Sequence, residues 1–278
     1  MIFKARERVW DLSYKTLVVG VINATPDSFS DGGRCLDPGA AALKAVEFQQ
    51  AGADVLDIGA ESSRPGASLI TVEEEMGRLA PVLNAVLKET GLPVSVDTVK
   101  ADVAAFALKQ GACIVNDVSG LKGDSGMAEV VARFQAGIVI MHRRGDSRTM
   151  RQLTQYENLI ENVLAELEES IDMALKAGIS YDRIAVDPGI GFAKTKDQSL
   201  SLIKHLGSFQ KFERPILIGP SRKSFIGEIT GKRPEERIFG TAASVALAVE
   251  RGARMIRVHD VREMKEVIEV TQAILNAQ

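Results

Sequence analysis

The sequence predicts an α/β protein built as a single (β/α)₈ TIM barrel. Short β-branched runs alternate with amphipathic stretches along all 278 residues, a pattern typical of a parallel sheet covered by helices. Eight such runs are present, which is the number that closes a barrel. The length suits one barrel, and no linker or change of composition divides the chain, so we expect one domain over residues 1–278.

The eight runs are expected to be strands buried on both faces, because each is short and rich in Val and Ile. They are Leu17–Ile22, Val55–Ile58, Val94–Val96, Ile114–Val115, Gly137–Met141, Arg183–Val186, Ile216–Ile218 and Met255–Val258. The helical stretches between them include Pro38–Gln50, Thr71–Glu89, Lys100–Gln110, Tyr156–Lys176 and Pro234–Arg251. Residues 1–16 precede the first run, and we expect them to form a short N-terminal cap, such as a hairpin, over the barrel bottom.

Composition and charge exclude several classes of protein. Apolar residues make up 45% and charged residues 26%, which are ordinary globular values and exclude a disordered chain. Lys and Arg total 34 against 37 Asp and Glu, a net charge of −3, so no nucleic-acid partner is expected. No apolar run of about 18 residues is present, so we expect no membrane partner. The two cysteines, Cys35 and Cys113, and the absence of a signal-peptide pattern predict a reducing, cytoplasmic location.

Polar side chains stand at the ends of most predicted strands, which is where chemistry occurs in this kind of barrel. Side chains alternate along a strand, so Ser95 shares a face with Asp97, and Arg257 shares one with His259. If the smaller side chains face the barrel axis, the polar end residues face it too. We therefore expect one cavity with a cationic rim beside it. The cavity residues are Asp97, Asn116, Asp187 and Lys223, and the rim residues are Arg64, Arg257 and His259.

This set of side chains suits a small heterocycle that carries phosphate. Carboxylates accept paired N–H bonds from a guanidine-like edge, Asn both donates and accepts, and Arg matches phosphate oxygens. Each residue alone has an ordinary explanation, since an Asp at a strand end often caps the next helix. We interpret Asp57 and Asp117 as structural, and Cys35 as incidental. Convergence on one cavity is what favours a ligand site.

Five stretches of the sequence closely resemble the dihydropteroate synthase family. They are Asn23–Gly33, Gly52–Pro65, Asp187–Phe192, Ser221–Gly227 and Arg257–Asp260, and the resemblance covers residues 17–270 in the family's order. It implies an enzyme that joins 6-hydroxymethyl-7,8-dihydropterin diphosphate to p-aminobenzoate, giving 7,8-dihydropteroate and diphosphate, with Mg²⁺ as cofactor. It also implies a homodimer formed through late helices, for which the small, apolar stretch Gly240–Val249 is a candidate.

The resemblance also implies a role for each matching residue. Asp97, Asn116, Asp187 and Lys223 match pterin-binding positions, and Ser63, Arg64, Arg257 and His259 match diphosphate-binding positions. Pro65, Phe192, Lys223 and Ser224 match positions around p-aminobenzoate, Met141 and Gly219 are expected to line the same cavity, and Asn23 matches a metal ligand. Phe29 and Asp31 belong to a first loop that is expected to close over the reacting centre. We expect Asp97, Lys223, Arg257 and Asp31 to be catalytic.

Four positions depart from the family's usual residues. Ala60 and Ala193 stand where Gly is usual, Ser63 replaces Thr, and Arg143 stands where Met is common. None removes a catalytic group, but p-aminobenzoate affinity and loop mobility are open to change. Two alternatives remain. A pterin-binding methyltransferase acting on methyltetrahydrofolate is disfavoured by the Ser221–Gly227 stretch and the rim. A non-catalytic pterin-binding paralogue is disfavoured by the intact cations of the cavity and rim.

Overall fold

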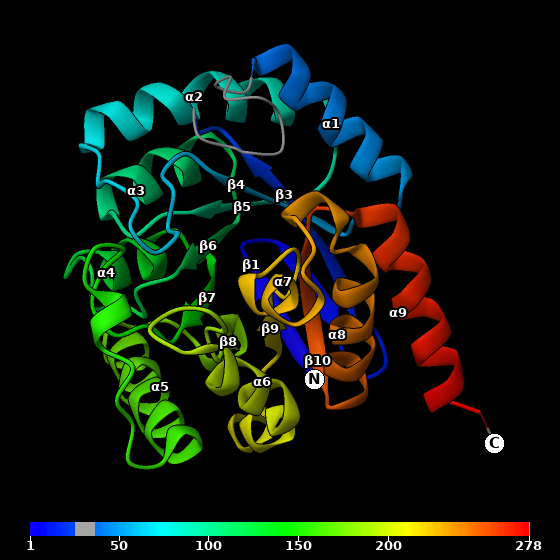
Figure 1. Cartoon of the computed structure of the whole chain (residues 1–278). Helices are drawn as coiled ribbons and strands as arrows, with labels where there is room; N and C mark the ends of the chain where they lie inside the picture. Colours follow the sequence, from blue (N-terminus) through cyan, green and yellow to red (C-terminus); the bar gives the residue numbers. More distant parts are fainter. Residues whose placement is uncertain (26–36, 278) are drawn as a thin grey trace.

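Eight parallel strands close into a barrel, as the sequence predicts. The computed structural model describes residues 1–25 and 37–277. The strands follow one another around the barrel in sequence order, and the last pairs with the first. They are β3 (Leu17–Asn23), β4 (Val55–Gly59), β5 (Val94–Asp97), β6 (Ile114–Asp117), β7 (Gly137–Met141), β8 (Ile184–Asp187), β9 (Ile216–Ile218) and β10 (Ala253–Val258). In Figure 1 they form the inner layer and the helices lie outside them.

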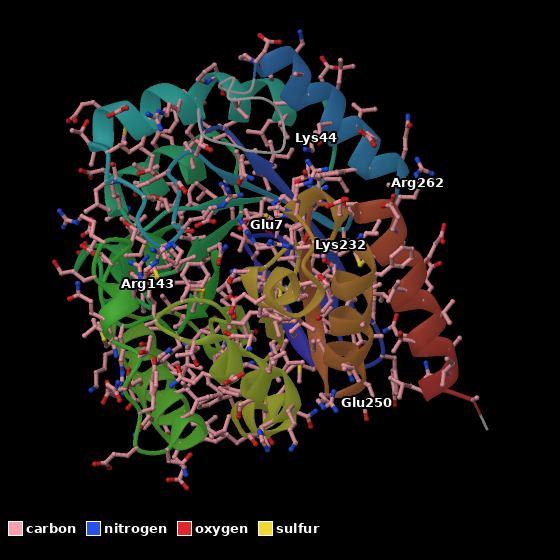
Figure 2. The ribbon with its side chains drawn as sticks, in the orientation of Figure 1. Glu7, Lys44, Arg143, Lys232, Glu250 and Arg262 are labelled. Carbon is pink, nitrogen blue, oxygen red and sulfur yellow. The ribbon has the colours of Figure 1, made fainter. Side chains whose placement is uncertain are left out.

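The helices cover the strands as an outer ring (Figure 1). They are α1 (Pro38–Gln50), α2 (Val72–Glu89), α3 (Ala101–Gln110), α4 (Met127–Arg133), α5 (Leu159–Lys176), α6 (Lys196–Lys204), α7 (Ser224–Thr230), α8 (Ile238–Glu250) and α9 (Val261–Leu275). Charged side chains such as Glu250 and Arg262 project from the outside of the ring (Figure 2). Within residues 1–25 and 37–277, no helix is long and apolar enough to cross a membrane.

Two of the predicted helices begin later than expected. The stretch from Tyr156 becomes helical only after Asn158, whose side chain caps α5. The stretch from Pro234 forms a short 3₁₀ turn before α8 begins. The Arg237 guanidinium donates to the Lys232 carbonyl (2.9 Å) and holds the chain in a turn there. In both places a side-chain contact, rather than helix propensity, determines where the helix starts.

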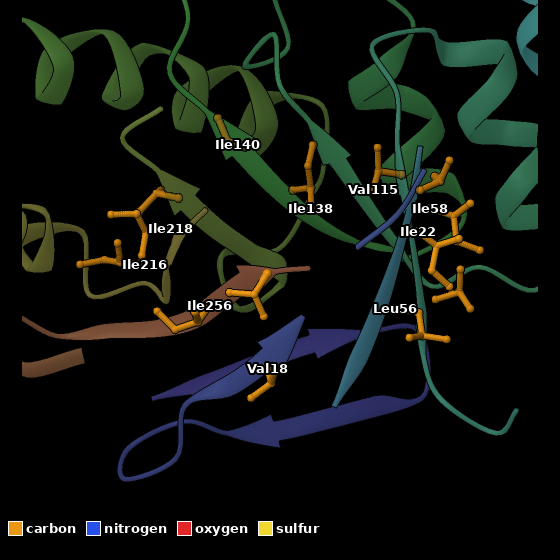
Figure 3. Packing of buried hydrophobic residues seen from close by; sticks show 14 of the residues in the cluster. Val18, Ile22, Leu56, Ile58, Val115, Ile138, Ile140, Ile216, Ile218 and Ile256 are labelled. Atoms are coloured by element: carbon orange, nitrogen blue, oxygen red, sulfur yellow. The ribbon is translucent and has the colours of Figure 1, made fainter. Parts of the chain in front are cut away.

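Strand side chains alternate between two hydrophobic clusters. Val18, Ile22, Leu56 and Ile58 point outward and pack under the helices, in the cluster shown in Figure 3. Their neighbours, such as Val19, belong to a separate inner cluster on the barrel axis. Because side chains alternate regularly along a strand, this arrangement also directs the polar end residues of the strands toward the axis.

A hairpin closes the bottom of the barrel, which confirms the predicted N-terminal cap. β1 (Ile2–Ala5) pairs antiparallel with β2 (Arg8–Asp11), and Phe3 is fully buried in the inner cluster. Gly137 at the start of β7 makes room for the hairpin, because a Cβ there would lie 2.8 Å from the Phe3 ring. The inner cluster is apolar at this end, and the polar residues lie at the opposite end of the strands.

Candidate active site

Strand register brings polar residues to one level at the top of the barrel. Asn23 on β3 lies opposite Gly59 on β4, Gly59 lies opposite Asp97 on β5, and Asp97 lies opposite Asn116 on β6. Gly59 leaves space for its neighbour, since a Cβ there would lie 3.3 Å from the Asp97 Cβ. Farther around the barrel, Asp187 closes β8 in the same inward orientation. Residues from distant parts of the sequence therefore face one space.

That space is a cavity of about 360 Å³, including its open mouth. Its volume falls in the range of small-molecule sites. The cavity is lined by residues that the sequence analysis assigned to the site and by two that it did not, Val118 and Ile190. The assigned lining residues are Ser63, Asp97, Asn116, Met141, Asp187, Phe192, Gly219, Lys223 and Arg257.

Arg257 bridges two carboxylates below the cavity mouth. Its Nε donates to Asp57 Oδ2 (2.6 Å), and a terminal guanidinium nitrogen donates to Asp97 Oδ2 (2.9 Å). The same Asp57 oxygen accepts from Asn116 Nδ2 (3.2 Å). The Asp57 side chain is 1% exposed, and its Oδ1 has no hydrogen-bond partner in the part of the chain that the structure describes. One buried carboxylate therefore holds two residues that face the cavity.

Burial sets the protonation of the cavity carboxylates. It raises the pKa of Asp97 to about 7, with the Arg257 charge acting in the opposite direction and Asp57 adding to the rise. Burial also raises the pKa of Asp187 to about 6, against the Gly189 amide (2.7 Å) and the Lys223 charge, which both favour ionisation. Both carboxyl groups are thus poised near neutral pH, unlike exposed carboxylates.

Lys223 extends into the cavity from the N-terminal end of α7. Its ammonium lies 4.3 Å from the centre of the Phe192 ring, a cation–π contact. Burial lowers the pKa of Lys223 to about 8, and the Asp187 charge opposes this. The backbone before it is held by Arg222, whose guanidinium pairs with Asp260 (2.5 Å). The cavity therefore places one ammonium between a carboxylate and an aromatic face.

His259 is placed where its positive charge is disfavoured, unlike the two arginines of the predicted cationic rim. Burial lowers its pKa well below the usual value, and the nearby Arg257 charge adds to the effect. Its Nδ1 lies 3.0 Å from Ser221 Oγ, while that oxygen accepts from the His259 amide (3.2 Å). The Ser221 hydroxyl therefore donates to Nδ1, and we assign the ring proton to Nε2, where it is available to an anion.

The sequence of the barrel is similar to one family of known proteins. Residues 19–259 match the family model described as pterin binding enzyme. Dihydropteroate synthase of Bacillus subtilis (strain 168) is 44% identical over 267 residues, which cover 95% of this chain and 91% of that protein. The chain belongs to the dihydropteroate synthase family.

Two solved structures of dihydropteroate synthases superpose on this chain over nearly its full length. The Xanthomonas albilineans protein in complex with 7,8-dihydropteroate has a TM-score of 0.89 and 36% identity, with 100% of both chains covered. The Thermus thermophilus protein in complex with 4-aminobenzoate has a TM-score of 0.88 and 40% identity, with 99% of this chain and 100% of that chain covered. The family resemblance deduced from the five sequence stretches is confirmed.

Several residues assigned from the dihydropteroate synthase resemblance lie around the cavity rather than in its lining. Arg64 is exposed and Pro65 is half-buried on the loop after β4, and Ser224 is exposed as the first residue of α7. Asn23 ends β3 half-buried. Phe29 and Asp31 lie outside the described residues, so the predicted role of the first loop stays a prediction.

The departures from the dihydropteroate synthase pattern have distinct structural settings. Ala193 adopts a left-handed backbone conformation with φ of 49°. The Gly that is usual in the family adopts this conformation without steric cost. Ala60 is buried after β4. Arg143, labelled in Figure 2, is half-buried, and its Nε has no hydrogen-bond partner among residues 1–25 and 37–277. None of these three disturbs the contacts of Arg257 or Lys223 described above.

Asp57, interpreted from the sequence as structural, supports the site without lining it. It contacts Asn116 and Arg257, which both line the cavity. A signal was available, because Asp57 lies two residues before Gly59 on the same strand and therefore faces the axis. What the sequence did not reveal is that Arg257, 200 positions later, lies beside it.

Proposed function

We propose that this protein joins 6-hydroxymethyl-7,8-dihydropterin diphosphate to p-aminobenzoate, giving 7,8-dihydropteroate and diphosphate. The observation that carries the proposal is the single cavity lined by Asp97, Asn116, Asp187 and Lys223, with Arg257 at its edge. Two carboxylates, an amide and an ammonium satisfy the polar edge of a pterin, and a guanidinium beside them suits its diphosphate. Membership of the dihydropteroate synthase family supports the same assignment.

Each part of the two substrates has matching side chains. The ionised Asp97 and Asp187 accept N–H bonds from the pterin edge, Asn116 both donates and accepts, and Lys223 donates. Ser63, Arg64, Arg257 and His259 are proposed to bind the diphosphate. Pro65, Phe192, Lys223 and Ser224 are proposed to surround p-aminobenzoate, with Met141 and Gly219 completing the wall of the cavity.

The reaction replaces a C–O bond by a C–N bond. The dihydropterin ring releases electron density toward its exocyclic methylene carbon, so diphosphate leaves with the bonding electron pair. The arylamine nitrogen then attacks that carbon, and its proton passes to solvent or to diphosphate. Arg257 and His259 stabilise the departing anion, while the carboxylates of Asp97 and Asp187 stabilise the pterin cation. The proposed reaction therefore depends on charged side chains held in place around the substrate, and it needs no strong general base to activate the arylamine.

We propose that Asn23, at the end of β3, would hold a Mg²⁺ ion together with oxygens of the diphosphate. Within the described residues there is no group of three or more His, Cys, Asp or Glu side chains suited to a metal. Mg²⁺ is commonly held by one or two protein oxygens together with phosphate oxygens and water. The amide oxygen of Asn23, half-buried at the end of β3, supplies one such ligand. Bound there, Mg²⁺ would neutralise charge on the diphosphate.

A diphosphate-release assay tests the proposed function. We expect release that depends on both the pterin diphosphate and p-aminobenzoate, and that stops when EDTA removes Mg²⁺. Methyl transfer from methyltetrahydrofolate without diphosphate release would support the methyltransferase alternative instead. Tight pterin binding with no turnover would support a non-catalytic paralogue. Each alternative therefore gives its own result in the same set of measurements.

We also propose a homodimer formed through α7, α8 and α9. Large apolar side chains are exposed on these helices, among them Phe239 (86% exposed), Ile274 (69%), Val270 (60%) and Ile229 (59%). The opposite face of α8 packs on the barrel through Val245 and Ala248. A second copy of the chain that covers these side chains by two-fold symmetry would remove them from water.

Cys113 is a free, buried thiol, and we propose a cytoplasmic location on that basis.

A further inference from the structure

The loop between β8 and α6 forms one wall of the cavity and has an unusual backbone. Ile190 and Phe192 of this loop line the cavity. Gly189, Gly191 and Ala193 all have positive φ, and the value of 49° at Ala193 is unfavourable for a residue with a Cβ. A backbone of this kind persists only where surrounding contacts hold it. The position of the Phe192 ring therefore depends on what anchors the loop.

Lys194 is the buried anchor of this loop. The residue is 9% exposed, and its side-chain nitrogen donates to the Phe192 carbonyl (2.9 Å), to His142 Nδ1 (2.8 Å) and to the His142 carbonyl (3.5 Å). Burial lowers the pKa of Lys194 to about 7, and the Asp187 charge opposes this. His142 follows β7, so the two bonds to His142 tie the β8 loop to the neighbouring strand. The backbones are in close contact as well, because a Cβ on Gly189 would lie 2.0 Å from the His142 carbonyl oxygen.

Helix α5 completes the anchor. His142 Nε2 lies 3.0 Å from Glu166 Oε2, and Arg144 also pairs with Glu166. Because Nδ1 accepts from Lys194, we assign the ring proton to Nε2, where it is donated to Glu166. Burial and the Lys194 charge lower the pKa of His142 to about 4, so the imidazole is neutral. The Tyr156 hydroxyl also holds the loop, by donating to the Ala193 carbonyl (3.0 Å).

We propose that Lys194 is a positioning residue for the reaction: it fixes the Phe192 ring at the p-aminobenzoate side of the cavity. Lys194 does not line the cavity, so it acts through Phe192 rather than by touching substrate. The ring it places lies 4.3 Å from the Lys223 ammonium. The inference rests on the proposed function, because it assigns the Phe192 ring to the second substrate.

The test is Lys194→Met, which keeps the apolar stem and removes all three hydrogen bonds of the side-chain nitrogen. We expect KM for p-aminobenzoate to rise by about tenfold, as for the loss of a buried hydrogen bond that holds the Phe192 ring in place. KM for the pterin diphosphate, measured at pH 8.5, should stay within about twofold, since Lys194 makes no hydrogen bond to Asp97, Asn116 or Asp187. The higher pH is needed because the Lys194 charge helps to lower the pKa of Asp187, so removing it reduces the ionised fraction of Asp187 near neutral pH. The matched control is Lys196→Met two residues later, whose side chain is 39% exposed and pairs with the exposed Asp197 (3.9 Å). It should change neither KM.

A milder variant keeps the proposal testable if Lys194→Met does not fold. Tyr156→Phe removes the hydroxyl that donates to the Ala193 carbonyl and leaves the ring in place. We expect a smaller rise in KM for p-aminobenzoate, again with little change for the pterin. If both KM values rise together, or neither rises, Lys194 has no positioning role. If the wild-type protein releases no diphosphate, the proposed function fails first, so the two failures are distinguishable.

Discussion

Replacing Arg257 by Ala tests the central ion-pair network of the site. In this structure the guanidinium holds Asp57 at 2.6 Å and Asp97 at 2.9 Å. Without it, two carboxylates face each other, and Asp57 is 1% exposed. Asp57 Oδ1 already has no hydrogen-bond partner within the described part of the chain. The substitution therefore perturbs both the fold and the anion site, and the two effects must be measured separately.

The stability effect follows from the burial of the pair. Removing one partner of a buried ion pair destabilises a protein by about 3–5 kcal/mol. The Arg257 side chain is 22% exposed, so solvent screening favours the lower value of about 3 kcal/mol. At about 2–4 °C per kcal/mol for a chain of this size, Tm should fall by about 6–12 °C. Thermal unfolding of the Arg257→Ala protein without ligand measures this loss.

The functional effect should depend on the diphosphate. Removing one preorganised donor to a developing anion lowers kcat by about 10²–10³-fold. Calorimetry with the pterin diphosphate and with the same pterin lacking diphosphate should show the larger loss for the first ligand. The loss common to both ligands reflects Asp97, whose pKa of about 7 is held down by the Arg257 charge. That common part should diminish at pH 8.5, because a larger fraction of the Asp97 carboxyl is ionised there.

Equal losses for both ligands at every pH would refute the anion role of Arg257 and leave it as a support for the pocket. The control is Arg257→Lys, which keeps the charge but has a single ammonium. An ammonium lacks the planar fork that reaches both carboxylates at once. It should recover part of the diphosphate-dependent affinity and little of the stability.

Three further outcomes are expected. Asp187→Asn should keep the fold, because the amide oxygen of Asn still accepts from the Gly189 N–H. Calorimetry should show pterin binding weakened by about 2–4 kcal/mol, since the Asn side chain offers a donor where the pterin needs an acceptor. Burial raises the pKa of Asp187 to about 6, so its ionised form is lost as pH falls. Protonation of Asp187 should therefore lower the pterin affinity of the wild type about tenfold per pH unit below pH 6, and the Asn variant should lack this contribution. Light scattering at micromolar concentration should give a dimer for the wild type and a monomer for Phe239→Lys.

The barrel was predictable because two periodicities agree along the chain. Runs rich in Val and Ile mark strands buried on both faces, and the stretches between them have helical patterns. The inner and outer clusters of the structure, represented by Val19 and Val18, are the two faces of that pattern. The errors occurred where a single tertiary contact overrides local propensity. The turn at Pro234, held by the Arg237 guanidinium, is one such place.

The site residues that lie on strands were predictable, because the alternation of side chains along a strand shows which of them face the barrel axis. Asp97, Asn116 and Asp187 end strands, and alternation directs them inward. Lys194 was missed because its ammonium is placed by a loop with three positive φ values, which no periodic pattern reveals. The lowered pKa of His259 could not be read from the sequence, because its causes, burial and the approach of Arg257, both depend on the closed barrel. What the sequence lacks is the set of distances between strands 100 or more residues apart.

Those distances give Arg257 a place in both halves of the proposed substrate site. Its guanidinium donates to Asp97, the proposed pterin ligand, and is itself the proposed partner of the diphosphate. Asp57 accepts from Nε (2.6 Å), so the side chain stays tied to Asp57 if its bond to Asp97 is lost. An anion that drew the guanidinium away from Asp97 would free one carboxylate oxygen for pterin N–H groups, but it would also raise the pKa of Asp97, because the Arg257 charge lowers it. We therefore expect binding of a pterin and of an anion to be coupled through this side chain. Because such coupling is reciprocal, each ligand must change the affinity of the other by the same factor, which calorimetry with one ligand in the presence of the other measures.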